Sequence, residues 1–386
     1  MKQIKIDVSK DILKWVESQS IAQEFTPAVN EYLHTWISEE AKPTYNQLVK
    51  VSKATGIPFG YFFLRKPPME DISIVEYRTV DSTELRHPSR NLIDTMKSME
   101  AIQDWMHTYL DESLGKRDYV GAMKGQTNIR VFAEYVFNTL SLKDNWRTGC
   151  SSASELFKVI RNAISNAGTV VMLNGIVGNN THRPLNIREF RAFAMVDDIA
   201  PLIFINNNDS DNGKLFSLLH EFAHICLGEN SLFNEPVIND AKIKRTEVLC
   251  NAVAAEILVP TESFVSIWKQ SSETDVKSRI RSIGGKYCCG TLVVARKALD
   301  HGFINERLYL EVADEVNKAF QKKQSEKKNG GGSYYRTAAS RFDRNFLSCL
   351  AGSVTSGKTS YTDAFAMTNT NRKTYANLMD MIGGLR

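Results

Sequence analysis

The stretch His220-Glu221-Phe222-Ala223-His224 constrains this chain most, because it places two histidines four residues apart in an apolar segment. Positions i and i+4 of an α-helix lie on one face, one turn apart. The apolar residues between Lys214 and Cys226 predict that this helix is buried on most sides. Buried imidazoles and a carboxylate carry a desolvation cost that a divalent metal ion would offset. The spacing therefore favours metal ligation over two structural histidines.

The ends of this helix and the residue between the histidines add to the prediction. We expect Asp211 or Asn212 to cap the start of the helix and Gly228 to end it. Glu221, beside the first histidine, could contact a water on the metal and act as general base. That chemistry requires a third protein ligand that leaves one coordination position open, and it predicts hydrolysis.

The third ligand is expected from a second helix, which runs from Arg245 to Pro260. Glu247 could complete a site of two histidines and one glutamate for a single Zn²⁺ ion. Asn251, one turn further on, could accept a hydrogen bond from the outer ring nitrogen of a ligand histidine. The rivals of Glu247 are Glu229, Glu235 and Glu256. At about 100° per residue, Glu256 points to the opposite side of the helix from Glu247.

The two helices together resemble the ImmA/IrrE family of bacterial and phage zinc metallopeptidases, in which a His-Glu-x-x-His helix precedes a Glu-x-x-x-Asn helix that ends in proline. The resemblance implies that His220, His224 and Glu247 bind one Zn²⁺ ion and that Glu221 is the catalytic base. It implies an α+β fold class, with a zincin-like core of a small sheet and the two helices. It also implies a protein substrate, a repressor or an antitoxin-like partner.

The strands before the motif resemble those of a long-chain subgroup of the same family. They cover 175–183, 189–193 and 201–206. We expect the segment from Arg191 to Val196 to form a sheet edge that pairs with an extended substrate. His182 and Arg191 are the candidate substrate contacts. Asn179, Asn180 and His182 could touch substrate or polarise a carbonyl, but a turn is favoured for this segment, because Gly-Asn-Asn is ordinary turn chemistry.

The first 66 residues are expected to form short helices, the last of which starts with a Thr44–Gln47 capping box and stops at Gly56. They resemble the XRE-type helix-turn-helix domain that precedes the peptidase in this subgroup. DNA binding is one of two functions open to this domain, because nine basic and seven acidic side chains leave little electrostatic attraction for a duplex. Docking of a protein partner is the alternative, and no DNA-binding residue is identified.

The last part of the chain is basic, with eleven Lys and Arg residues against four Asp and Glu residues from Gln321 onward. A charged and then Gly-rich segment favours a flexible linker. An apolar stripe from Tyr335 to Leu350 then begins a helical module that could bind nucleic acid or an acidic partner.

We predict boundaries of 1–66 for the helix-turn-helix-like domain, 67–91 for a linker, 92–317 for the metallopeptidase domain, 318–333 for a flexible linker and 334–386 for the C-terminal domain.

Composition limits the compartment. No stretch approaches the run of about 18 apolar residues that spans a bilayer, and Met1–Asp7 is too charged to lead into a signal sequence. The six cysteines contain no Cys-x-x-Cys pair, so we expect free thiols in a cytoplasmic protein without a membrane partner. The competing function is a DNA-binding regulator, or the antitoxin of a toxin pair, with a structural or vestigial metal site.

Overall fold

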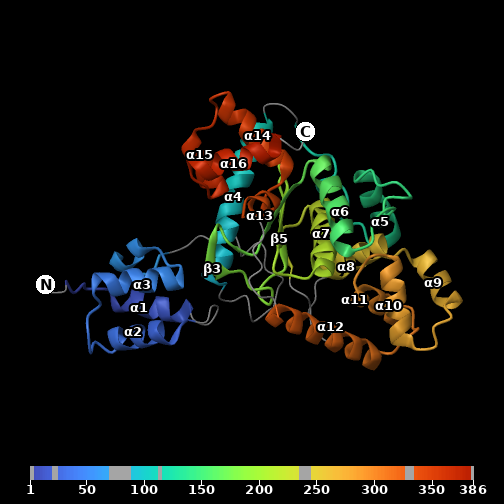
Figure 1. Cartoon of the computed structure of the whole chain (residues 1–386), viewed down its shortest axis with the longest axis horizontal. Helices are drawn as coiled ribbons and strands as arrows, with labels where there is room; N and C mark the ends of the chain where they lie inside the picture. Colours follow the sequence, from blue (N-terminus) through green and yellow to red (C-terminus); the bar gives the residue numbers. More distant parts are fainter. Residues whose placement is uncertain are drawn as a thin grey trace. The chain divides into compact units, whose positions relative to one another are not determined.

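The computed structural model of the chain describes residues 4–19, 25–68, 88–111, 115–233, 245–326 and 334–383. These residues form helices, a four-stranded mixed sheet and a two-stranded hairpin, which confirms the α+β class (Figure 1). They divide into two compact units, whereas the sequence predicted three domains and two linkers. Unit 1 holds Met1–Ser98 and Ile176–Leu185, and unit 2 holds Met99–Gly175 and Asn186–Arg386.

Unit 1 begins with a helical module, as predicted. Thr44 and Gln47 form the expected capping box, and Gly56 ends the helix in the left-handed region with a φ of 74°. The buried side chains of the module include Val16, Leu33 and Phe62. Its elements are α1 Lys10–Ser18, α2 Pro27–Ile37, α3 Tyr45–Thr55 and the 3-10 helix η2 Phe59–Phe63.

The hairpin of unit 1 is tied to the first turn of α4 (Arg90–Asp111). Strands β2 (Ile176–Val177) and β3 (Asn180–Pro184) are joined by a turn at residues 178–179, so the turn predicted around Asn179 is confirmed. Arg183 in β3 pairs with Asp94 at 2.7 Å. Helix α4 starts close to the predicted position 92, whereas residues 69–87 of the predicted linker lie outside the described residues.

The sheet of unit 2 has the strand order β1-β5-β4-β6. Strands β1 and β5 are parallel, and β4 pairs antiparallel with both β5 and β6. The strands are β1 Val170–Asn174, β4 Ala192–Met195, β5 Leu202–Asn206 and β6 Ser231–Phe233. The prediction that Arg191 to Val196 forms an edge is therefore wrong. Strand β6, which follows the motif helix in the chain, covers that side of β4 and becomes the edge of the described sheet.

The helices of unit 2 account for most of its residues. Helix α7 packs on β4 and β5, and lies beside both α6 and α8 (Figure 1). The helices that follow α4 are α5 Ile129–Thr139, α6 Ala153–Ala167, α7 Asp211–Leu227, α8 Arg245–Leu258, α9 Thr261–Gln270, α10 Val276–Lys286, α11 Thr291–Asp300, α12 Glu306–Glu326, α13 Tyr334–Arg341, α14 Arg344–Thr355, α15 Tyr361–Thr368 and α16 Arg372–Gly383. All six cysteines are free thiols, as expected.

Two predictions for the C-terminal third need correction. Helix α12 extends through Glu326, so the predicted flexible linker 318–333 begins inside a helix. Its charged residues are good helix formers and make pairs one turn apart, such as Asp314 with Lys318 at 2.6 Å. The stripe from Tyr335 to Leu350 is split between α13 and α14, because Asp343 caps a new helix. Residues 327–333 lie outside the described residues.

The C-terminal helices close the other edge of the sheet. The backbone N–H of Val171 in β1 donates to Oδ2 of Asp343 at 3.2 Å, and its carbonyl accepts from Arg161 at 2.9 Å. Arg161 also donates to the carbonyl groups of Ser340 and Phe342. An open edge strand presents unpaired backbone groups that invite aggregation, and these contacts satisfy both groups of Val171.

Replacing Asp343 with alanine is expected to lower the free energy of unfolding by about 2–4 kcal/mol, because a buried helix cap and the partner of a buried N–H are lost together. Asp343 is 1% exposed, and its Oδ1 also accepts from the N–H groups of Asn345 and Phe346. Urea denaturation measures the loss. The matched control is Asp275→Ala, which removes an exposed cap of α10 and should cost less. Equal losses in the two variants would contradict the edge-closing role.

Among the described residues, no single helix has the length and apolar character to cross a membrane. One bent pair, α8 with α9, meets that test by length and composition.

Candidate metal centre

Helix α7 holds the two histidines in a buried and well-anchored position. Ser210 caps the helix by accepting from the N–H of Gly213 at 3.0 Å, so the predicted cap at Asp211 or Asn212 is one or two residues too late. Gly228 ends the helix with a φ of 75°, as predicted. Two carbonyl groups of the last turn accept from the N–H groups of Gly121 and Met123, at 3.1 and 2.8 Å. These bonds satisfy backbone acceptors that a helix end leaves open.

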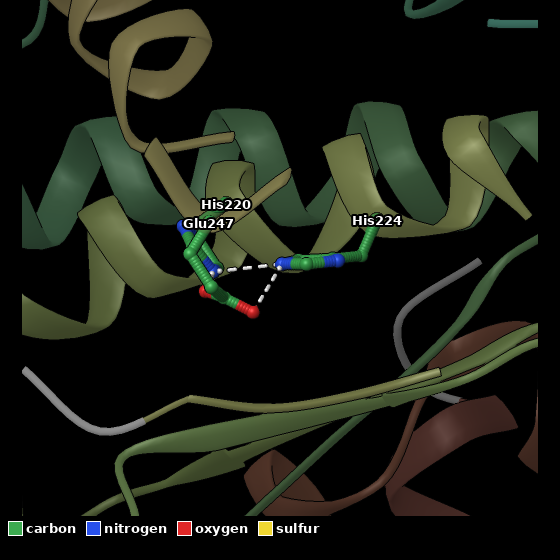
Figure 2. Close-up of side chains that lie close together, drawn as sticks. All are labelled: His220, His224 and Glu247. Carbon is green, nitrogen blue, oxygen red and sulfur yellow. Dashed lines mark hydrogen bonds and ion pairs between the residues drawn. The ribbon is translucent and has the colours of Figure 1, made fainter. Parts of the chain in front are cut away.

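Three side chains from α7 and α8 converge on one point. Nε2 of His220 lies 3.2 Å from one oxygen of Glu247, and Nε2 of His224 lies 3.3 Å from the other. The two Nε2 atoms are 3.1 Å apart. Figure 2 shows both rings directed toward the Glu247 carboxylate, which comes from the neighbouring helix. The ligand atoms of the three residues all lie within 4.8 Å of one another, so this group could hold a metal ion.

The chemistry of this donor set fits a cation. Both histidines are buried, and the Glu247 side chain is only 13% exposed. Burial acts to raise the pKa of Glu247, but its contacts with His220 and His224 outweigh that effect and hold the pKa well below its usual range. Burial lowers the pKa of His220. Burial acts to lower the pKa of His224 as well, but its contacts with Cys250 and Glu247 outweigh that effect and raise the pKa well above its usual value. The ionised Glu247 and the neutral His220 ring are thus in the form that metal binding requires, and a metal ion would displace the proton of His224.

Glu221 is completely buried on the same helix. One of its oxygens, Oε2, accepts a hydrogen bond from the hydroxyl of Ser231 in β6. The other, Oε1, has no hydrogen-bond partner among the described residues. Burial raises the pKa of Glu221 to about 7, against the opposing influence of His224 and Ser231. A carboxyl group with a pKa near neutrality is suited to both accept and donate a proton.

The rivals of Glu247 lie elsewhere. Glu256 pairs with Lys297 and accepts from the backbone N–H of Thr261 at 2.9 Å, so the helical spacing correctly separated it from Glu247. Glu229 is exposed after the end of α7, and Glu235 lies outside the described residues. Only Glu247, among these four, meets both histidines within the described part of the chain.

Asn251 lies beside His220 and acts to raise the pKa of that ring. Its Oδ1 atom is buried, but it does not reach hydrogen-bonding geometry with any described residue. The hydrogen bond from a ligand histidine to Asn251 therefore stays a prediction.

The roles of the two candidate substrate contacts stay predictions. Arg191 pairs with the buried carboxylate of Asp209 at 3.1 Å. His182 is an exposed residue of β3 and belongs to unit 1. Sequence reasoning missed Ser231, because a lone serine in a three-residue strand carries no recognisable pattern; only its position shortly after the motif helix could have drawn notice.

Comparison with known families agrees with this geometry. Residues 166–287 match the model of the IrrE N-terminal-like domain, peptidase family M78, and this segment contains all three converging side chains. Residues 342–381 match a domain of unknown function, DUF8813. No curated protein and no solved structure matches the chain. Residues 166–287 thus resemble an IrrE N-terminal-like domain of peptidase family M78, which agrees over that segment with the resemblance to the ImmA/IrrE family.

Proposed function

We propose that this chain is a zinc-dependent endopeptidase that cleaves a specific partner protein, a repressor or antitoxin-like protein of a bacterial or phage regulatory system. The observation that carries the proposal is the convergence of His220, His224 and Glu247, with ligand atoms 3.1 to 3.3 Å apart, beside a fully buried Glu221. The family match over the same residues agrees with it. The regulatory substrate rests on the resemblance to ImmA/IrrE proteins alone.

Zinc is the ion that suits this donor set, because two imidazoles and one carboxylate are a common catalytic zinc site. His220, His224 and Glu247 would hold it, and the bound ion would supply Lewis-acid polarisation of the scissile carbonyl. Glu221 would take a proton from the attacking water and then pass it to the leaving amine. Because Glu221 is buried, its carboxylate would interact more strongly with a bound cation than it would in water.

Strand β6 offers the place for an extended substrate. It is the edge of the described sheet on the side of β4, and its Ser231 touches Glu221. A peptide that adds to a sheet edge binds through main-chain hydrogen bonds, which tolerate many side chains. We therefore place the substrate strand beside β6 rather than at the interior strand β4.

The proposal is tested by incubating the zinc-loaded protein with a proteome-derived peptide library and with the intact proteome, then labelling new N-termini for mass spectrometry. We expect new N-termini that share a sequence around the cleaved bond. They should vanish with 1,10-phenanthroline and return with added zinc. A protein that holds one zinc per chain and creates no new N-termini in either sample would sink the peptidase assignment.

The alternative function is a DNA-binding regulator, which the side chains of α2 do not favour. The exposed residues of α2 include Asn30, Glu31 and His34 and no Lys or Arg, so this helix offers no cation to phosphates or guanines. A gel shift with the region upstream of the chain's own gene, with and without chelator, tests that alternative. Tight and salt-sensitive binding without proteolysis would favour it.

A further inference from the structure

Ser231 joins the sheet edge to the buried carboxylate of Glu221. The serine is 3% exposed in β6, and its backbone pairs with Ala194 in β4. Its hydroxyl donates to Oε2 of Glu221, which lies on α7. A hydroxyl on a paired strand is held by the sheet backbone, so this contact gives the carboxylate a fixed partner outside its own helix.

The contact makes the two oxygens of Glu221 inequivalent. Oε2 is occupied by the Ser231 hydroxyl, whereas Oε1 is buried without a hydrogen-bond partner among the described residues. A carboxylate anchored at one oxygen loses rotational freedom, so its other oxygen keeps one direction. Proton transfer depends on such fixed geometry, because a misplacement of about 1 Å can slow a reaction roughly 100-fold.

We propose that Ser231 is a positioning residue of the peptidase, which fixes Oε2 of Glu221 so that Oε1 is the atom that carries the proton. This inference rests on the proposed function. In the hydrolysis, an O–H bond of water breaks and its proton moves to Oε1, while the water oxygen bonds to the scissile carbonyl carbon. The C–N bond then breaks, and Oε1 returns the proton to the leaving nitrogen. Ser231 keeps its own proton throughout.

The substrate edge and the base are coupled by this arrangement. Ser231 belongs to the strand on which the substrate is proposed to pair, so order in that strand and the orientation of Glu221 depend on one another. Because the hydroxyl points to Glu221 and not to the substrate, its removal should lower kcat more than it changes KM.

The kinetic test compares Ser231→Ala, Ser231→Thr and Ser231→Cys with wild type, on a peptide found with the library. We expect Ser231→Ala to lower kcat about 10-fold or more, the typical effect of losing a hydrogen bond to a charged group, with KM within about twofold. Ser231→Thr should recover most of the rate, and Ser231→Cys, a weak donor, should fall between. All variants should bind zinc like wild type. An unchanged kcat in Ser231→Ala would overturn the proposal.

The matched control is Ser353→Ala. Ser353 is also a buried serine, 2% exposed, and its hydroxyl bonds to Thr359 in the C-terminal helices. This variant should lose stability comparably and keep its kcat. A similar fall in kcat for Ser353→Ala would mean that the effect of Ser231→Ala is general destabilisation, which overturns the positioning role.

A second readout needs neither metal nor activity. In a double-mutant cycle on the metal-free protein, urea unfolding is measured for Ser231→Ala, Glu221→Ala and the double variant. Ser231→Ala should raise the unfolding equilibrium constant of the protein. We expect this increase to be about tenfold smaller in the Glu221→Ala background than in the wild-type background. If the stability losses of the two single variants simply add up in the double variant, the two side chains do not interact, and the proposal is overturned. If the wild type binds zinc and cleaves no peptide or protein, the proposed function is overturned, even if Ser231 and Glu221 are coupled in stability.

Discussion

Replacing Glu221 with glutamine is expected to slow peptide hydrolysis about 10²- to 10⁴-fold, the usual contribution of a general base. Glutamine has the size of glutamate and can still accept the hydrogen bond from Ser231, but it cannot take a proton from water. Because Glu221 is buried and is not one of the three converging residues, its replacement should leave metal binding intact. Turnover of the library-derived peptide and zinc per chain by elemental analysis measure the two effects.

Glu229→Gln is the control for this experiment. Glu229 is an exposed carboxylate just beyond the end of α7, so its loss should alter neither turnover nor zinc content. Undiminished turnover by Glu221→Gln with one zinc per chain would contradict the role of Glu221 as base. Loss of both turnover and zinc would show instead that Glu221 supports the metal site.

Replacing Glu247 with glutamine is expected to weaken zinc binding by more than about 100-fold, because even a residue behind a metal ligand changes affinity by 10- to 100-fold. Zinc at about 100 times its Kd stabilises a folded protein by about 2.7 kcal/mol. The wild type should therefore unfold at a higher temperature with zinc, and Glu247→Gln should not. Isothermal titration and thermal unfolding with and without zinc provide the measurement.

Glu256→Gln tests whether α8 uses one particular carboxylate. Glu256 pairs with Lys297, and their side chains are 19% and 8% exposed. Removing one partner of such a pair leaves a buried charge and costs about 3–5 kcal/mol of stability. We expect this variant to be less stable and to bind zinc like wild type. If Glu256→Gln lost zinc and Glu247→Gln kept it, the ligand assignment would be reversed.

Local patterns were sufficient to find the two helices of the candidate metal centre and the side chains on them that converge. The spacing of His220 and His224 within an apolar run places two rings on one buried face, whatever surrounds the helix. The same arithmetic on α8 separates Glu247 from Glu256. Helix ends were predicted where one residue type has little choice, as at Gly56 and Gly228, which both take positive φ angles.

Patterns failed where the outcome depends on a distant partner. From the sequence, the apolar strand β4 was expected to be an edge. In the structure β6, which follows α7 in the chain, pairs with it. Charge alone could not tell a helix from a linker in the last turns of α12, because its charged residues also favour helix. No pattern in the basic C-terminal segment predicts that Asp343 accepts a hydrogen bond from Val171 in β1.

Short-range periodicity thus sets which face of each helix carries a candidate ligand, since an α-helix repeats every few residues and displays one face regardless of context. The convergence of His220, His224 and Glu247 depends in addition on the packing of α7 against α8. The pairing of β6 with β4, the contact of Asp343 with β1, and the hydroxyl of Ser231 against Glu221 arise from long-range contacts. A strand's neighbours are chosen by competition among all segments that can bury the same surface, so no local window contains that choice.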